Sequence, residues 1–276
     1  MISCKEYVVI KKEELKENIK TFKRPPKLCV IQVGDNPASN SYIRGKGRDC
    51  EEVGIEFEHV KRKEDISQNQ LEALVDIKSK DKTIDGLIVQ LPLPKHINVE
   101  RITNLIPPNK DVDGFRRDSC FNACTPKGVI DWLEYNEINL EGKVCTVLGR
   151  SKIVGKPLTN MLIDRGATVI SCNSKTSEAD IMTSFEYSDI IISAIGKLHH
   201  WKKWYFLETS KPLILIDIGI NYDENGKQCG DFNNDCITAC KKGSYITPPK
   251  GGTGLLTRLS LVQNTVESYK LNNGGI

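Results

Sequence analysis

A tyrosine and a lysine four residues apart are the first residues of this sequence that could do chemistry together. Tyr42 and Lys46 lie in a segment whose start and stop signals predict a helix over 37–53. Residues four apart lie one turn apart on the same helix face, so the phenol and the amine should project together. Such a pair suits proton chemistry. The alternative is an ordinary solvated basic run, because Arg44 and Arg48 flank the lysine.

The segments on either side of this helix predict how it is positioned. An apolar run over 28–33 predicts a buried strand before it. Asn36 can cap the helix with Pro37 at its first position, and Gly54 supplies the stop. A second strand over 55–60 completes a βαβ unit. The tyrosine and the lysine should therefore project beyond the carboxyl end of a strand.

Further polar residues follow the next predicted strand. The strand over 85–91 ends in the sequence VQLPLP, whose prolines place Gln90 near the carboxyl edge of the sheet, where open α/β sheets bind ligands. A capped strand end with a solvated glutamine is an equally good interpretation. Asp111 and Asp113 lie in a loop of turn residues, where acids are by default solvated turn formers.

The second half of the chain carries a possible nucleotide site. A strand over 143–148 is followed by a turn that begins at Gly149 and reaches Gly155, where a helix should start. This turn does not have the G-x-G-x-x-G pattern, so by itself it indicates a dinucleotide site only weakly. Glycines at both ends still allow close backbone approach, and the helix would offer N–H groups to a phosphate. A tight turn that binds nothing is the alternative.

The next strand of this half bears on the choice of cofactor. The strand over 167–172 should lie beside the first, and Asn173, Ser174 and Lys175 follow it. An NAD site normally has Asp or Glu at this point, to bind the ribose 2′-hydroxyl. Hydrogen-bond donors without a carboxylate suit the 2′-phosphate of NADP instead, and Arg150 in the preceding turn adds a cation.

Composition and charge argue against several classes of function. The 276 residues include 39 basic and 36 acidic ones, for a net charge of +3, which suggests neither a nucleic-acid nor a membrane surface. No apolar run approaches the roughly 20 residues of a membrane span, and the first residues do not open a signal peptide, so we expect a soluble cytoplasmic protein. The ten cysteines form no CxxC pair and should be reduced thiols. The four histidines complete no metal-ligand spacing with them, so we expect no metal.

Several of these motifs, in this order, resemble one enzyme family. The segment Gly34–Ser39, with Tyr42 and Lys46, is similar to the first signature of the bifunctional methylenetetrahydrofolate dehydrogenase/cyclohydrolase family. The blocks VQLPLP, KDVDG, GRSKIVGKP and TPPKGGTG are similar to later signatures, and the resemblance runs from about residue 27 to 267. The chain departs from the family at Ala123, Asn173, Lys250, Thr253 and Leu255–Leu256.

The resemblance implies a fold and a division of the chain. It implies an α/β protein with two α/β domains flanking a cleft, the second being a Rossmann-like NADP-binding domain. Alternation of predicted strands and helices independently favours mainly parallel sheets. We place the folate-binding, catalytic domain at residues 1–118 plus 251–276 and the NADP-binding domain at 119–250.

The resemblance also implies an activity. A member of this family would oxidise 5,10-methylenetetrahydrofolate to the methenyl compound with NADP, and would hydrolyse that compound to 10-formyltetrahydrofolate. This places the chain in one-carbon metabolism and purine biosynthesis, with tetrahydrofolate derivatives as substrates. The family suggests a homodimer.

The resemblance assigns roles to individual residues. Lys46, Tyr42 and Gln90 would be catalytic, and Tyr42, Gln90, Asp113 and Gly252 would bind the folate, with Asp113 on the pterin ring. Arg150 and Ser174 fall on the positions that bind the 2′-phosphate. The full set of expected cofactor-binding residues is Gly149, Arg150, Ser151, Ile153, Val154, Gly155, Ser174, Ile195, Gly196, Gly219 and Ile220.

Two other interpretations stay open. The altered loop at Lys250 could have removed one activity, which would leave a monofunctional dehydrogenase or cyclohydrolase. The chain could also be a non-catalytic sensor that binds dinucleotide or folate. The joint presence of Tyr42, Lys46, Gln90 and Asp113 speaks against a sensor, which would need the pocket but not the amine.

Overall fold

The structure, a computed structural model, describes residues 1–274 and divides into two compact units. One unit, here the β1 unit, comprises Val8–Cys124 and Arg258–Ile276. The other, the β4 unit, comprises Met1–Tyr7 and Thr125–Thr257. The limits expected at 118/119 and 250/251 lie a few residues before the changeovers at 124/125 and 257/258, whereas Met1–Tyr7, expected in the first domain, falls in the β4 unit. The expected limits stay a prediction.

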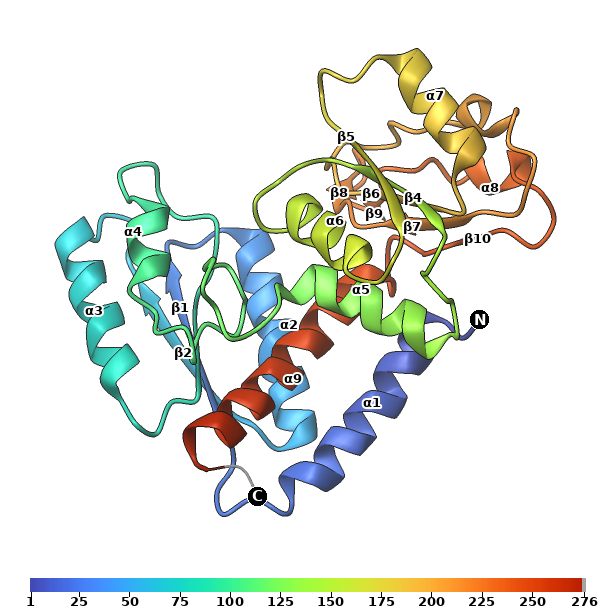
Figure 1. Ribbon diagram of the computed structural model, residues 1–276. Helices are drawn as coiled ribbons and strands as arrows, with labels where there is room; N and C mark the ends of the chain where they lie inside the picture. The colour runs from blue at the N-terminus through green and yellow to red at the C-terminus, as the bar shows by residue number, and fades with distance from the viewer. Residues whose placement is uncertain (275–276) are drawn as a thin grey trace. The chain divides into compact units, whose positions relative to one another are not determined.

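The β1 unit is built around a three-stranded parallel sheet in the order β2-β1-β3. Its elements are β1 (Lys27–Val33), α2 (Pro37–Val53), β2 (Glu56–Arg62), α3 (Gln68–Lys80), β3 (Gly86–Val89) and α4 (Val99–Asn104). The predicted strand–helix–strand order is confirmed, with α2 joining β1 to β2 and α3 joining β2 to β3 (Figure 1). Both connections are crossovers between parallel strands, as such pairing requires.

Local signals fix both ends of α2 as the sequence predicted. The side chain of Asn36 accepts hydrogen bonds from the N–H groups of Ala38 (3.0 Å) and Ser39 (3.1 Å). Pro37 opens the helix, where its missing N–H costs nothing. Gly54 ends it at φ 89°, and its N–H donates to the carbonyl of Cys50. The helix that carries the tyrosine and the lysine is therefore held at both termini.

Two apolar clusters cover the two faces of this sheet. Leu28 and Val30 of β1 pack in one cluster together with residues of α2 and of the C-terminal helix. Cys29 and Ile31 pack in the other, together with residues of α3 and α4. Alternate strand residues point to opposite faces, so the continuous apolar run of β1 satisfies both layers.

The β4 unit has a five-stranded parallel sheet in the order β10-β7-β6-β4-β5. Its main elements are β4 (Val144–Leu148), α6 (Gly155–Ile163), β5 (Thr168–Cys172), α7 (Glu178–Tyr187), β6 (Ile190–Ser193), β7 (Ile214–Asp217), α8 (Cys236–Ala239) and β10 (Tyr245–Ile246). A two-stranded ribbon of β8 (Asn221–Tyr222) and β9 (Gln228–Cys229) follows β7. The strand order reverses between β4 and β6, which in doubly wound sheets is where ligands bind.

Three longer helices contain the points at which the chain passes from one unit to the other. They are α1 (Cys4–Ile19), α5 (Cys124–Tyr135) and α9 (Thr253–Asn272). The helix α1 ends at Ile19, before Pro25, which disfavours the helical conformation at Arg24. The helix α9 begins at Thr253, whose hydroxyl donates to the carbonyl of Asp217 (2.7 Å).

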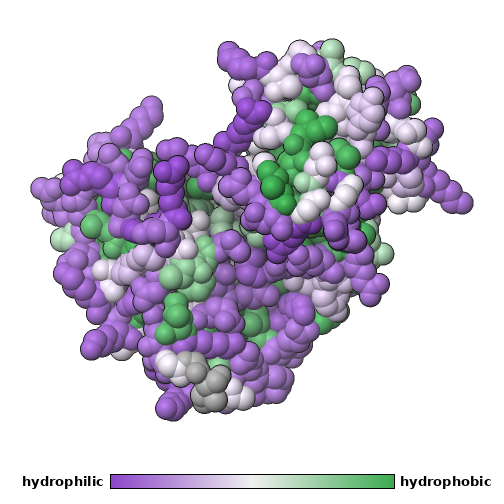
Figure 2. Space-filling model, viewed as in Figure 1, coloured by the Kyte–Doolittle hydropathy of each residue, from purple (hydrophilic) through white to green (hydrophobic). Residues whose placement is uncertain are grey.

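The surface and the cysteines add three observations. Hydrophilic residues cover most of the face shown in Figure 2, and apolar side chains appear in separate groups. None of the helices within residues 1–274 is long and apolar enough to cross a membrane. All ten cysteines are free, and the same residues contain no cluster of His, Cys, Asp or Glu that could hold a metal ion.

Candidate functional site

Lys46 is buried at the carboxyl edge of the β1-unit sheet and bonds to Gln90. Only 5% of the lysine is exposed, and its Nζ donates to the Gln90 Oε1 over 3.0 Å. Arg44 and Arg48, in contrast, are exposed. The solvated-run alternative therefore describes the two arginines and fails for the lysine. Lys46 and Gln90, to which the family resemblance assigns catalytic roles, are thus in contact.

Sheet register brings these two residues together across 44 positions of sequence. β1 and β3 are parallel neighbours, and the N–H of Gln90 continues their ladder by donating to the carbonyl of Ile31 (2.8 Å). The Gln90 amide nitrogen donates to the carbonyl of Leu91 (2.9 Å), which turns its oxygen towards the lysine. The strand order reverses at this point, so a ligand is expected beyond these strand ends.

The neighbours of Lys46 on α2 have separate tasks. Tyr42 lies one turn before it and is half-buried. Asp49 is buried and pairs with Lys12 (2.7 Å) and Arg258 (2.9 Å) rather than with Lys46. A Cβ on Gly45 would lie 2.1 Å from the Arg258 guanidinium, so this glycine makes room for the arginine. The sequence reading missed this charge cluster, because its members lie far apart in the chain.

The two aspartates of the KDVDG loop differ in burial. Asp113 is half-buried, and no hydrogen bond joins it to Lys46 or Gln90 within residues 1–274. Asp111 is 2% exposed, and its carboxylate accepts from the N–H of Arg116 (2.9 Å). The default interpretation of a solvated turn former is therefore wrong for Asp111. Burial raises the pKa of its carboxyl, and the bond from Arg116 opposes that rise.

In the β4 unit, the turn after β4 is packed too closely for side chains at its two glycines. Gly149 has φ 111°, and a Cβ there would lie 2.7 Å from the carbonyl oxygen of Ala194. A Cβ on Gly155 would lie 2.0 Å from the carbonyl oxygen of Gly149. The first turn of α6 is thus pressed against the end of β4, which leaves its backbone open to close approach.

The N–H groups of this turn differ from the expectation. Ser151 Oγ accepts from the N–H groups of Val154 (3.2 Å) and Gly155 (3.3 Å), and the Ser151 carbonyl accepts from Lys156 N–H (3.0 Å). The helix N–H groups expected to meet a phosphate are bonded within the turn instead. Ile153, which lies between Ser151 and Val154 in the turn, is exposed.

The expected 2′-phosphate residues lie at the end of β5. Arg150 donates from its guanidinium to the hydroxyl of Ser171 (3.2 Å) and to the carbonyl of the same residue. Ser174 and Lys175 follow this strand and are exposed, and Asn173 accepts from the N–H of Lys175 (2.9 Å). The cation from one turn is thus held at the end of the neighbouring strand.

The remaining predicted cofactor residues lie in two loops at the same edge of the sheet. Ile195 and Gly196 follow β6, and Gly219 and Ile220 follow β7. Two buried aspartates hold the loops. Asp231 accepts hydrogen bonds from the first loop, and Asp217 accepts from Gly219. The sequence analysis assigned no role to either aspartate.

Asp217 is also the group with a large pKa shift in this region. Burial raises the pKa of its carboxyl to about 7, with the nearby Asp231 contributing in the same direction. The N–H groups of Asp231, Phe232 and Gly219 oppose the rise. Gly252 lies near this strand end as well, because its neighbour Thr253 donates to the Asp217 carbonyl. Gly252 belongs to the β4 unit, unlike the other three residues expected to bind folate.

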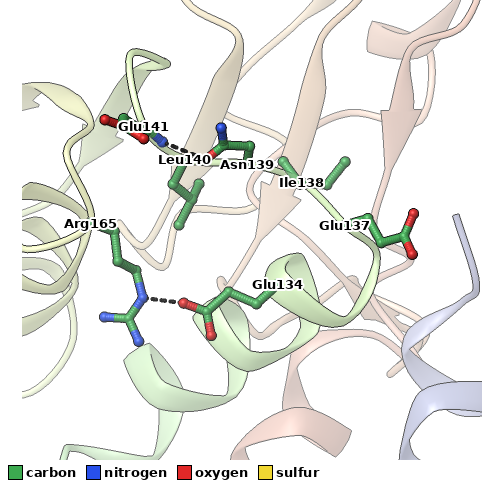
Figure 3. A pocket seen from close by; sticks show the side chains of 7 residues that line it. All are labelled: Glu134, Glu137, Ile138, Asn139, Leu140, Glu141 and Arg165. Carbon is green, nitrogen blue, oxygen red and sulfur yellow. Dashed lines mark hydrogen bonds and ion pairs between the residues drawn. The ribbon is translucent and has the colours of Figure 1, made fainter.

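A hollow of about 410 Å³ in the β4 unit lies at the other edge of the sheet (Figure 3). Leu140 and Glu141 precede β4, and Arg165 precedes β5, so the hollow is at the amino ends of the strands. Figure 3 shows Arg165 pointing to Glu134, with which it forms an ion pair. Ligands of doubly wound sheets bind at the carboxyl ends, so we do not assign this hollow to the nucleotide.

Comparison with known families covers nearly the whole chain. Residues 2–113 match the tetrahydrofolate dehydrogenase/cyclohydrolase catalytic domain. Residues 123–273 match the tetrahydrofolate dehydrogenase/cyclohydrolase NAD(P)-binding domain. The bifunctional protein FolD of Campylobacter jejuni is 41% identical over 272 residues, which cover 94% of each chain. That of Bacillus anthracis is 39% identical over 282 residues, covering 98% of this chain and 96% of the relative.

Solved structures give the same result. The crystal structure of the bifunctional FolD dehydrogenase/cyclohydrolase from Campylobacter jejuni matches with a TM-score of 0.91 at 39% identity, covering 98% of both chains. The Trypanosoma brucei FolD structure, a complex with NADP cofactor and inhibitor, matches with a TM-score of 0.90 at 28% identity, covering 100% of this chain and 98% of that one. The predicted family and the predicted two-domain α/β fold are confirmed. The chain belongs to the tetrahydrofolate dehydrogenase/cyclohydrolase family and carries its catalytic and NAD(P)-binding domains in that order.

Proposed function

We propose that this chain oxidises 5,10-methylenetetrahydrofolate with NADP and hydrolyses the methenyl product to 10-formyltetrahydrofolate. The observation that carries the proposal is the buried amine of Lys46, bonded to a neutral amide at a strand edge where ligands bind. Burial of a lysine that has no carboxylate partner costs free energy of folding. That cost supports a functional role for the amine. Asp49, the nearest acid along α2, is already paired with Lys12 and Arg258.

Hydrolysis of the methenyl bridge needs a group that both takes and gives a proton. Water adds its oxygen to the bridging carbon and loses a proton, which Lys46 Nζ accepts. The bond from this carbon to N5 then breaks, N5 takes the proton from Nζ, and the new hydroxyl loses its proton to solvent as the formyl group forms. One proton is released overall. Gln90 keeps the amine in place during both transfers, as its 3.0 Å bond indicates.

Tyr42 and Asp113 would bind the substrate. The phenol lies one turn from the amine on α2, so it can donate a hydrogen bond beside the reacting carbon. A carboxylate at Asp113 can accept two hydrogen bonds from the donor edge of a 2-amino-4-oxopterin. Gly252 would contact the folate through its backbone.

The β4 unit has the donor set that NADP requires. When bound, NADP supplies the acceptor for the hydride. Gly149 and Gly155 let the turn pack closely on itself without side chains between its backbone and a dinucleotide, and the end of β5 has no carboxylate to repel a 2′-phosphate. Arg150 and Ser174 would hold that phosphate. The loops that contain Ile195–Gly196 and Gly219–Ile220 would hold the nicotinamide half, and orientation is the main task of the protein in hydride transfer.

One experiment tests the whole proposal. The purified protein is given 5,10-methylenetetrahydrofolate with NADP or NAD, or the methenyl compound alone, and formation of the methenyl and formyl products is followed separately. We expect both products, with NADP preferred. Formation of one product alone would establish a monofunctional enzyme, for which the exposed Lys250 in the altered loop is the first residue to examine. Binding of both ligands without either product would establish the sensor.

We also infer a homodimer in the cytoplasm that acts in one-carbon metabolism and serves purine biosynthesis. Family membership supports these inferences. It also supports the assignment of folate to the β1 unit and of NADP to the β4 unit. Sedimentation velocity over a range of low micromolar concentrations tests the dimer. A monomer at every concentration in that range would refute it.

A further inference from the structure

Asp231 is completely buried and collects hydrogen bonds from two loops of the β4 unit. It lies in the segment Gly230–Phe232 that follows β9, and it is 0% exposed. Its Oδ2 accepts from Ser193 Oγ (2.8 Å) and from the N–H groups of Ile195 (2.9 Å) and Gly196 (3.3 Å), and its Oδ1 accepts from Lys197 N–H (2.8 Å) and Asn221 Nδ2 (3.1 Å). Five donors therefore converge on one carboxylate.

Three of these donors are consecutive backbone N–H groups in the loop after β6. Such a run of N–H groups, here with Gly196 at φ 63°, forms a concavity that binds an anion. The anion in this case is internal, since the carboxylate of Asp231 occupies it. The conformation of the loop 194–197 thus depends on a negative charge supplied by a residue more than thirty positions away.

A second aspartate accepts hydrogen bonds from the backbone of the segment that contains Asp231. Asp217, at the end of β7, accepts from the N–H groups of Asp231 (3.0 Å) and Gly219 (3.0 Å). A Cβ on Gly219 would lie 2.0 Å from the Asp231 carboxylate, and a Cβ on Gly230 would lie 1.9 Å from that of Asp217. Each carboxylate is packed directly against the backbone next to the other, so the loops have little freedom to shift.

We propose that Asp231 is a positioning residue for the dinucleotide, holding the loops 194–197 and 219–221 in their binding conformation before the cofactor arrives. The inference rests on the proposed function, which places these loops against the nicotinamide half. The competing explanation is that Asp231 only stabilises the fold of the β4 unit. The two explanations differ in what happens to a folded variant, because only positioning predicts weaker NADP binding without loss of folded protein.

Asp231→Asn separates the two explanations. The amide keeps one acceptor oxygen, but its NH2 group faces the N–H and O–H donors that the other carboxylate oxygen accepted. The hydrogen bonds to that oxygen are lost, and the loop moves. Bonds to charged groups are worth roughly tenfold to a hundredfold in an equilibrium, so we expect NADP to bind at least about tenfold more weakly. Cyclohydrolase activity, assayed without NADP, should stay within about twofold. NADPH titration measures the first quantity directly.

The chain offers a matched control and a report of folding. Asp235→Asn removes a charge four residues further along the chain, at a carboxylate whose buried Oδ1 has no hydrogen-bond partner among residues 1–274, and should leave NADP affinity unchanged. The three tryptophans, Trp132, Trp201 and Trp204, all lie in the β4 unit, so their fluorescence reports the folded fraction of this unit alone.

The outcomes decide between the proposals. Wild-type NADP affinity in folded Asp231→Asn overturns the positioning role, and so does a loss that only parallels the unfolded fraction. If Asp231→Asn does not fold, Asn221→Ala decides, because it removes a single donor and should weaken NADP a few-fold; unchanged affinity there overturns the inference. Failure of the wild-type protein itself to bind NADP overturns the proposed function instead.

Discussion

The two candidate sites lie at equivalent places in their sheets but are built from different parts of the chain. In both units the strand order reverses beside the first strand, and the candidate residues follow the strands at that reversal. The β1 unit presents side chains there, above all Lys46 and Gln90. The β4 unit presents mainly backbone, shaped by the close packing of Gly149 and Gly155 and by buried carboxylates.

This difference follows from what each site has to do. Proton transfer requires a titratable group at a defined place, so the β1 unit buries an amine and fixes it with an amide. Binding of a dinucleotide requires a backbone that a large ligand can approach closely, so the β4 unit removes side chains and holds its loops from behind. Substitutions should therefore act on the two sites in different ways.

The largest effect is expected from removing the amine of the β1 unit. Lys46→Met keeps the length of the side chain and the helix but carries no proton, so methenyl hydrolysis should fall by about 10²–10⁴. The dehydrogenase step should lose less, since it needs the substrate bound and oriented. The two rates are measured separately at matched folded fractions.

Two neighbouring residues on the same helix provide the controls for this substitution. Arg44 and Arg48 are exposed, so Arg44→Met and Arg48→Met should leave both rates almost unchanged. Hydrolysis by Lys46→Met at the wild-type rate would sink the proposed mechanism.

Adding a single methyl group to the β4 unit should damage a site made of backbone. In Gly155→Ala the new Cβ would lie 2.0 Å from the Gly149 carbonyl oxygen, so the turn has to move. Forced overpacking costs about 1–3 kcal/mol, and we expect NADP affinity to fall at least about tenfold while hydrolysis without NADP is retained. Asn160→Ala, at an exposed position of the same helix, is the control. Equal NADP affinity in both variants would show that the turn does not contact the cofactor.

The part of the molecule that could be predicted from sequence is the part with local signals. The helix over 37–53 was predicted to the residue, because its cap, its first proline and its final glycine all lie within it or beside it. The pairing of Lys46 with Gln90 followed from strand ends that face one edge, together with the family resemblance. Asp231 was missed because four of its five donors lie more than thirty residues away, and no local pattern specifies which donors will meet a buried carboxylate.

Burial of charge was the other feature that the sequence did not reveal. Asp111 reads as a turn former, yet it is 2% exposed. The cluster of Lys12, Asp49 and Arg258 joins three helices that are separated in the chain. A charged residue in a polar stretch gives no local indication of its burial, because tertiary packing alone decides it.

Arg150 offers a way to sharpen the comparison, since it is a side chain in a site made mostly of backbone. Arg150→Ala should weaken NADP about tenfold to a hundredfold and NAD much less, because the guanidinium would pair with a phosphate that NAD lacks. Titration of the variant with both cofactors measures the ratio. Equal losses for NADP and NAD would remove Arg150 from the 2′-phosphate site.

The change expected at Asp217 is one of stability, and it should appear as a dependence on pH. Burial raises the pKa of Asp217 to about 7 in the folded protein, against the ordinary value of 3.8. Because the folded pKa is the higher one, the protonated carboxyl favours folding, and this contribution is complete below about pH 4 and is lost as the pH rises to about 7. Relative to Asp217→Asn, which cannot titrate, the free energy of unfolding of the wild-type β4 unit should therefore fall by about 1 kcal/mol per pH unit across that window.

Other titrating groups are shared by the two proteins, so the difference between their curves isolates this carboxyl, and a constant offset from the amide does not affect the slope. Tryptophan fluorescence follows the unfolding of the β4 unit alone, since Trp132, Trp201 and Trp204 all lie there. Parallel curves for the two proteins between pH 4 and 7 would mean that Asp217 stays ionised, held by the three backbone N–H groups that it accepts.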